Sequence, residues 1–363
     1  MGCPLPPLAL QQAKLPVSMG GLGLREAADH AAAAYTASFL ASQDLVRSML
    51  STPQDAPPST LPPAVLTSLN TSLGEEVAAT QDSLLGVTQR QLSTRIDLAN
   101  QRLHSNLTRE SAGEREVARL ASLSLPFAGS WLNCPPMPAL NLHLRPTEFV
   151  TAVKIRLGLP VYDQAGPCPV CHLPSDTLAD HALVCGSGGE RILRHNLARD
   201  ALCDTAAAAG LSPIKEGRNL LPGTGRKPAD IFLPCWSGGR DAALDVTVTH
   251  PLQAATRAGA AATPGHAMTV AYNRKMAGAW DRCRAANIAF FPIVAESLGG
   301  WHPVAVDQIK KLARCLAMHT GQPIEASTAH LFTRLSTVLV RGCVEMALNR
   351  SPTFPSPEIG GTE

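Results

Sequence analysis

Residues 226–249 read RKPADIFLPCWSGGRDAALDVTVT, and this stretch decides the fold of the second half of the chain. The runs 229–234 and 242–249 are rich in apolar and β-branched residues, which is typical of strands. Residues 236–240 between them include Ser-Gly-Gly, which is typical of a turn. We therefore expect a β-hairpin whose centre falls near residues 237 and 238.

Two aspartates interrupt the expected strands. Folding the hairpin about this centre makes Asp230 and Asp245 near cross-strand neighbours. Two buried carboxylates side by side are unfavourable unless a cation neutralises them, and their oxygens suit Mg²⁺ or Mn²⁺. Such an ion could polarise a phosphate and activate a water for phosphodiester cleavage. The alternative is structural: Asp245 faces solvent and Asp230 pairs with Arg226 or Lys227.

Phosphodiester chemistry needs a further group to orient the water and to stabilise charge on the phosphorane. Lys275, in the helical run 271–276, is the best candidate, and the alternative is a solvated helix lysine. Glu216, from the segment before the hairpin, could complete the metal site, as could Glu190 at the start of the upstream helix. Glu296, at the end of an apolar strand, is a further candidate.

The elements around the hairpin follow from periodicity. Apolar spacing predicts a helix over 190–209, a helix near 265–286 and an apolar strand over 288–295. Helices are also expected over 304–318 and 329–348. The order strand, strand, helix, strand predicts a mixed α/β unit.

A second group of potential metal ligands consists of Cys168, Cys171, His181 and Cys185, which have the spacing C-x2-C-x9-H-x3-C. The two-residue gap lets both thiolates reach one ion, and residues 181 and 185 share a face of a helical turn, so a structural Zn²⁺ site is expected. His172 is a rival ligand, and the alternative is ordinary buried cysteines with a capping histidine. Bound metal would supply folding energy that residues 161–189 lack. The single cysteines, mostly expected in the core, are Cys3, Cys134, Cys203, Cys235, Cys283, Cys315 and Cys343.

The first half of the chain is expected to be mainly helical. An Ala-rich helix is predicted over 26–50, a Pro-rich linker over 51–63 and a helical connector over 64–160, which ends in a helix over 147–157. The tail after Pro352 is expected to be disordered.

Composition limits the partners and the cellular compartment that we expect for the protein. The 363 residues carry a formal net charge of +2, which neither demands nor excludes nucleic acid, and 45% of them are hydrophobic. Residues 1–15 lack the pattern of a secretory signal, and no apolar run is long enough for a membrane span to be expected. Ten cysteines without a signal peptide indicate metal binding in a reducing compartment, either nuclear or cytoplasmic.

The order of these motifs resembles one known arrangement. A zinc knuckle, a K-P-x-D strand, a D-V-T strand and a Tyr-x-x-Lys helix together resemble the C-terminal end of non-LTR retrotransposon polyproteins, whose restriction-like endonuclease belongs to the PD-(D/E)XK superfamily. The resemblance implies a restriction-endonuclease-like α/β core over 190–325. It also implies that Asp230 and Asp245 are metal carboxylates. Thr247 stands where many members have lysine, and Lys275, with Tyr272 three residues before it, takes that place.

The N-terminus extends the resemblance. Residues 15–25, LPVSMGGLGLR, are similar to the chain just past the reverse-transcriptase palm, which makes 1–50 a thumb-like remnant. No tyrosine begins a Tyr-x-Asp-Asp motif, so reverse transcription is not expected. The resemblance implies an endonuclease at 190–325, a CCHC knuckle at 161–189, and a C-terminal helix and tail at 326–363, with DNA and possibly RNA as partners. The alternative is an inactive, domesticated or truncated nucleic-acid-binding zinc protein.

Overall fold

A computed structural model of the chain describes residues 4–51, 59–74, 78–140, 142–218 and 229–351. The chain divides into two compact units, an N-terminal unit of Leu5–Ser111 and a C-terminal unit of Ala112–Glu363 with which Met1–Pro4 are grouped. Arg226 and Lys227, most of the predicted Pro-rich linker and the predicted disordered tail lie outside the described residues. The predicted connector 64–160 spans both units.

The N-terminal unit is helical throughout its described part. Its elements are α1 (Pro7–Lys14), η1 (Val17–Met19), α2 (Ala27–Met49), α3 (Pro63–Leu73), η2 (Asp82–Leu84) and α4 (Gln89–Ser111). The helix predicted over 26–50 is therefore confirmed as α2. Leu69, Leu84, Leu92 and Ile96 are fully buried and form the core between these helices.

The glycine-rich turn of residues 15–25 depends on one close backbone approach. A Cβ atom on Gly21 would lie 1.9 Å from the Leu15 carbonyl oxygen, so only glycine fits there. Arg25 then fixes the end of the turn to α4, because its Nη2 lies 2.5 Å from Oδ2 of the buried Asp97.

The C-terminal unit is built on a four-stranded sheet in the order β3-β4-β5-β6. Its strands are β3 (Ile214–Lys215), β4 (Ile231–Ser237), β5 (Arg240–Thr249) and β6 (Ala289–Glu296). The β3/β4 and β4/β5 pairs are antiparallel, and β6 lies parallel to β5 because α10 (His266–Ala285) connects them. The predicted mixed order of strands and helices is confirmed.

The predicted hairpin is also confirmed, with a bulge near its turn. Ile231 pairs with Leu244, whereas Ser237 pairs with Arg240, so β4 contains two extra residues between Leu233 and Ser237. Cys235, which has a φ of 52°, lies in this irregular part.

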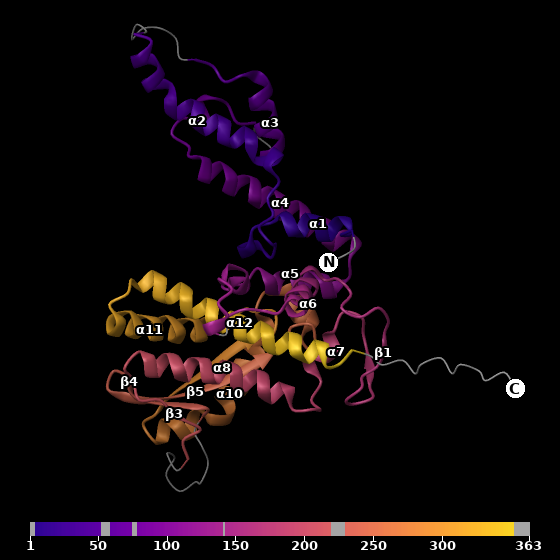
Figure 1. The fold of residues 1–363 in the computed structure, drawn as a ribbon, viewed down its shortest axis with the longest axis vertical. Helices are drawn as coiled ribbons and strands as arrows, with labels where there is room; N and C mark the ends of the chain where they lie inside the picture. The colour runs from indigo at the N-terminus through magenta and orange to yellow at the C-terminus, as the bar shows by residue number, and fades with distance from the viewer. Residues whose placement is uncertain (1–3, 52–58, 75–77, 141, 219–228, 352–363) are drawn as a thin grey trace, which may run out of the picture. The chain divides into compact units, whose positions relative to one another are not determined.

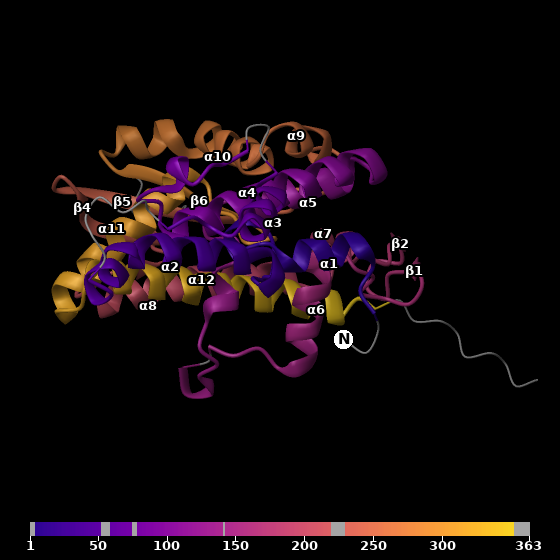
Figure 2. The same ribbon diagram turned by 90° about the horizontal axis from the view of Figure 1, so that it is seen from above.

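Helices cover both faces of the sheet (Figures 1 and 2). On one face, α8 (Glu190–Ala208), α11 (Pro303–Thr320) and α12 (Ile324–Leu348) enclose the largest core with the apolar side chains of β4, β5 and β6. On the other face, α10 packs through Cys283 against Ala243 and Phe290. These layers leave the end of β5 beside the N-terminal part of α8.

Smaller helices complete the C-terminal unit. They are α5 (Glu114–Leu123), η3 (Ser130–Asn133), η4 (Pro138–Leu140), α6 (Pro146–Leu157), α7 (Asp180–Val184) and α9 (Arg257–Ala262), and a two-stranded ribbon of β1 (Gly166–Pro167) and β2 (Pro174–Ser175) precedes α7. In the described part of the chain, no helix is long and apolar enough to cross a membrane.

Candidate metal-binding cavity and cysteine cluster

The end of β4 creates an open edge on β5. The last strand pair is Ile231 with Leu244, and the same register extended by one residue places Asp230 opposite Asp245. Beyond this point β5 continues to Thr249 without β4 beside it. Oδ2 of Asp230 accepts the Val246 backbone N–H at 2.8 Å, so the side chain takes the place of a strand partner. This bond explains how a carboxylate that is only 6% exposed is tolerated there.

A cavity of about 440 Å³ opens at this edge. The residues that line it are Gly186, Arg191, Ile192, Arg194, His195, Asp230, Asp245, Val246, Thr247, Val248, Arg274 and Lys275. Both predicted metal carboxylates and the predicted lysine therefore share one cavity, although they lie directly before β4, on β5 and on α10. Such a convergence of titratable groups in a concave site is typical of an active site.

Lys275 forms an ion pair with Asp245. Its Nζ lies 2.7 Å from Oδ2 of Asp245, and both side chains are partly shielded from solvent. Burial raises the pKa of Asp245 above its usual range; Lys275 opposes this shift, and the nearby Asp230 adds to it. Lys275 is therefore the cation paired directly with Asp245, in a cavity that three arginines also line.

The cavity also contains groups that the sequence analysis did not single out. His195 of α8 lies with its Nε2 3.4 Å from Oδ1 of Asp230. Arg191, one turn earlier on α8, and Arg274 of α10 also line the cavity. The sequence feature that could have indicated these residues is the i, i+4 spacing of Arg191 and His195, which puts them on one helix face. Nothing in the sequence shows that this face lies against the hairpin.

The donor set of the cavity fits a hard divalent ion. Asp230 and Asp245 offer carboxylate oxygens, and Thr247 lies on the same face of β5 as Asp245, two residues further on. The Thr247 hydroxyl is buried and has no hydrogen-bond partner among the described residues. Two adjacent carboxylates and an oxygen without a partner suit Mg²⁺ or Mn²⁺.

The other candidate carboxylates lie elsewhere. Glu216 follows β3, and its N–H donates to the Asp230 carbonyl, but its carboxylate pairs with Arg199 and is 44% exposed. Glu190 pairs with Arg350. Glu296 is buried beside Ser122, which donates a hydrogen bond to it. Neither these three glutamates nor Tyr272 is among the residues that line the cavity.

Tyr272 has a packing contact that explains its place on α10. Its ring stacks on His302, with the ring centroids 4.3 Å apart and the planes 11° from parallel. His302 is the N-cap residue of α11, so the stack joins α10 to the start of that helix. Tyr272 therefore lies one turn before Lys275 but points to a different neighbour.

The four predicted knuckle residues form one cluster. The ligand atoms of Cys168, Cys171, His181 and Cys185 all lie within 4.8 Å of one another, and Sγ of Cys171 is 3.2 Å from Nε2 of His181. In a tetrahedral zinc site with Zn–S distances near 2.3 Å, the sulfurs stand about 3.8 Å apart. This group could bind a metal such as zinc. His172 is exposed and does not belong to it.

Local turns explain why these four side chains converge. The β1/β2 ribbon turns through His172, which has a φ of 61°, and the Cys168 N–H donates to the Leu173 carbonyl at 2.9 Å. The Asp176 carboxylate then accepts the N–H groups of Asp180 and His181 at the start of α7. The cluster thus depends on short-range hydrogen bonds within residues 168–181.

The cluster is fastened to the rest of the C-terminal unit by buried charges. The fully buried Arg350 donates to the Ser187 carbonyl at 2.5 Å and pairs with Glu190 at 2.7 Å. Burial alone would raise the pKa of the Cys185 thiol, but the Arg350 guanidinium beside it contributes to holding that pKa below its usual range. Gly186, which directly follows Cys185, lines the cavity that contains Asp230 and Asp245. The cluster and the cavity are therefore neighbours.

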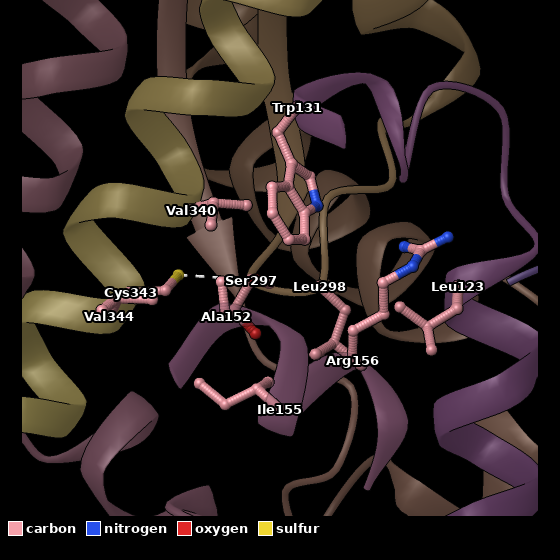
Figure 3. A pocket seen from close by; sticks show the side chains of 10 residues that line it. All are labelled: Leu123, Trp131, Ala152, Ile155, Arg156, Ser297, Leu298, Val340, Cys343 and Val344. Atoms are coloured by element: carbon pink, nitrogen blue, oxygen red, sulfur yellow. Dashed lines mark hydrogen bonds between the residues drawn. The ribbon is translucent and has the colours of Figure 1, made fainter. Parts of the chain in front are cut away.

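Two other hollows lack this chemistry. The first, about 20 Å³, holds little more than one water and lies between Cys343 and Val344 of α12 on one side and Leu123 and Arg156 on the other (Figure 3). The second, about 450 Å³, has a mostly apolar lining that includes Phe127 and Phe332 but no carboxylate among the described residues.

Comparison of the chain with protein-family models and with curated proteins finds no match. Function is therefore argued from the geometry of the cavity and the cysteine cluster.

Proposed function

We propose that the C-terminal unit is a metal-dependent DNA endonuclease whose active site is the cavity containing Asp230, Asp245 and Lys275. The observation that carries this proposal is the register of β4 and β5, whose extension by one residue places the two aspartates opposite each other in the lining of a 440 Å³ cavity. Paired carboxylates with an adjacent ammonium group are suited to phosphodiester hydrolysis.

Each side chain has a role that its contacts suggest. Asp230 and Asp245 would hold Mg²⁺ or Mn²⁺, which when bound supplies Lewis-acid polarisation of the phosphate and a more acidic water. Asp230 is oriented by the Val246 N–H, so one of its oxygens is fixed before substrate arrives. Nζ of Lys275 lies 2.7 Å from Oδ2 of Asp245. Its positive charge would stabilise the negative charge that develops on a neighbouring phosphate in the transition state.

The walls of the cavity suit a polyanionic substrate. Arg191 approaches from α8 and Arg274 from α10, so two guanidinium groups flank the carboxylates. Guanidinium groups bind phosphate oxygens in a bidentate manner and favour a nucleic-acid backbone. We expect binding to weaken steeply with added salt.

The element order supports a restriction-endonuclease-like core. Helix α8 precedes the meander β3–β4–β5, and α9 and α10 lead to the parallel strand β6. Asp230 directly precedes β4, Asp245 lies on β5 and Lys275 lies on α10. In this proposal zinc occupies the Cys3His cluster, which helps to bind nucleic acid. The chain then corresponds to the C-terminal part of a non-LTR retrotransposon polyprotein, with a thumb-like remnant at 1–50.

Plasmid nicking tests the proposal. Wild type and the double variant Asp230→Asn/Asp245→Asn are incubated with supercoiled plasmid in Mg²⁺ or Mn²⁺, and open-circle product is measured. Asp307→Asn, which alters an exposed carboxylate on α11, is the matched control. Nicking by wild type and the control but not by the double variant is expected. DNA binding without metal-dependent nicking by wild type would instead support the inactive nucleic-acid-binding zinc protein.

A further inference from the structure

Lysine and arginine side chains in the lining of the cavity differ in whether the protein already engages them. Nζ of Lys275 lies 2.7 Å from Oδ2 of Asp245, and the buried Arg194 donates to a backbone carbonyl of α7 at 3.3 Å. Arg191 and Arg274 are exposed, and neither has an ion-pair partner in the part of the chain that the structure describes. These two guanidinium groups are therefore available to an anion from solution.

Arg191 and Arg274 reach the cavity from opposite faces of the sheet. Helix α8 packs on the face of β5 that carries Leu244, whereas α10 packs on the face that carries Ala243. The guanidinium end of Arg191 borders the cavity, because its Nη1 lies 3.6 Å from where a Cβ atom on Gly186 would stand. A strand of nucleic acid that crosses this edge of the sheet would therefore meet one arginine on each side of the carboxylates.

The balance of charge in the cavity favours an anion before any cation is bound. Lys275 offsets the charge of Asp245, so the two available arginines stand against Asp230 alone. A concave site with such a surplus of positive charge attracts phosphate groups. The volume of about 440 Å³ is within the range of sites that enclose a small ligand, so a nucleotide unit can enter.

We infer that Arg191 and Arg274 bind the phosphates on either side of the scissile phosphate, and that they hold the DNA strand in the cavity without a divalent ion. The inference rests on the proposed function, because it takes the strand through the same cavity. Guanidinium groups form bidentate, charge-assisted hydrogen bonds with phosphate oxygens. Each phosphate that they neutralise releases a counterion, so each arginine contributes separately to the salt dependence of binding.

DNA binding can be measured without cleavage. The zinc-loaded full chain is titrated onto a fluorescein-labelled DNA duplex in buffer without added Mg²⁺ or Mn²⁺, and fluorescence anisotropy gives the affinity at several salt concentrations. The variants are Arg191→Ala, Arg274→Ala, the double alanine variant, and Arg191→Lys and Arg274→Lys, which keep the charge. Arg314→Ala, which alters an exposed arginine on α11, is the control, because α11 contributes no residue to the cavity lining.

Wild type and the control should bind DNA equally without a divalent ion. Each alanine variant should bind about tenfold more weakly and lower the slope of log affinity against log salt by about one, and the double variant should lower it by about two. The lysine variants should keep the slope of wild type. Slopes that stay unchanged in both alanine variants, or wild type that binds only after Mg²⁺ is added, would overturn the inference.

Plasmid nicking in Mg²⁺ separates this inference from the proposed function. Expected binding by wild type and the variants, but no nicking by wild type, would support the phosphate-binding arginines and reject the proposed cleavage. Nicking by wild type, with DNA affinity and salt slope unchanged in the double alanine variant, would reject the arginines and leave the proposed function standing.

Discussion

At the scale of single residues, the candidate site places two shielded carboxylates among several cationic side chains. Asp230 is nearly buried, and Asp245 has a raised pKa because of burial, with Lys275 as its ion-pair partner. A shielded ion pair of this kind contributes little to the free energy of folding, because the attraction between the charges barely offsets their desolvation. In the proposed function, the two carboxylates hold a cation and the basic side chains around them bind the phosphate.

Lys275→Ala should separate the cavity lysine from ordinary basic residues. The proposed function places this ammonium group beside the reacting phosphate, so its loss should reduce the metal-dependent nicking rate by about a hundredfold or more. Arg284→Ala removes an exposed positive charge from the same helix and should change the rate only slightly. Single-turnover nicking rates measure both, and equal losses in the two variants would indicate a general electrostatic effect.

Glu296 should make stability depend on pH. Burial raises its pKa from 4.5 to about 7, so the folded state keeps a proton that the unfolded state releases between these values. The contribution of protonated Glu296 to the free energy of unfolding is complete below the pKa of the unfolded state and is lost as pH rises through the pKa of the folded state. Glu296→Gln should therefore be more stable than wild type at pH 8, by up to about 3 kcal/mol, and nearly equal to it at pH 4.5.

Urea unfolding at the two pH values measures this difference. Glu325→Gln, which alters an exposed glutamate on α12, is the control and should show no such pH dependence. A constant difference between wild type and Glu296→Gln across this range would contradict the assigned cause.

At the scale of elements, the close contact between α8 and α12 determines where α8 lies, and α8 forms one wall of the cavity. Gly342 lies where the two helices meet, and a Cβ atom there would lie 2.9 to 3.1 Å from Cγ, Cβ and Cα of Arg194. Arg194 itself lines the cavity and donates to the Leu183 carbonyl at 3.3 Å. The position of α8, with His195 and Arg191, therefore depends on this glycine.

Gly342→Ala should destabilise the protein by about 1–3 kcal/mol, because the backbone of α8 must move to admit the methyl group. Gly278→Ala is a matched change on α10, where a Cβ atom would meet no other atom within 4 Å. It should be neutral or stabilising by up to about 1 kcal/mol. Denaturant unfolding of both variants gives the comparison, and a stabilising Gly342→Ala would contradict the packing described for α8 and α12.

The elements that could be predicted from sequence are those whose signals are local. Apolar and β-branched runs around a Ser-Gly-Gly turn predicted the hairpin, whose register extends to Asp230 and Asp245, and the cysteine spacing predicted the cluster. His195, Arg191 and Arg274 could not be placed, because their convergence depends on how α8 and α10 pack against the sheet. The ion pair between Glu216 and Arg199 likewise depends on side-chain directions that spacing does not encode.

At the scale of the whole molecule, the chain consists of two compact units, and both candidate sites lie in the C-terminal one. Within that unit the cysteine cluster connects to distant segments through buried ion pairs. Arg115 of α5 pairs with Asp180 of α7 at 2.6 Å, and Arg350 fastens the segment after Cys185. The cluster should therefore stabilise more than its own short segment.

Loss of metal from the cluster should weaken the C-terminal unit and its cavity together. Cys185→Ser should reduce bound zinc and lower the Tm by at least about 5 °C, because metal binding supplies folding energy. Cys235→Ser alters an exposed cysteine outside the cluster and should leave both unchanged. Zinc content with thermal unfolding measures the effect, and an unchanged Tm in zinc-depleted Cys185→Ser would contradict a structural role.

The most direct test of the central claim is the rate at which supercoiled plasmid is nicked by zinc-loaded protein over a range of Mg²⁺ concentrations. We predict that nicking by wild type rises with Mg²⁺ and saturates, and that Asp245→Asn abolishes it while DNA binding persists. Equal nicking by wild type and Asp245→Asn, or nicking by wild type that does not depend on a divalent ion, would contradict the assignment of the cavity as a metal-dependent nuclease site.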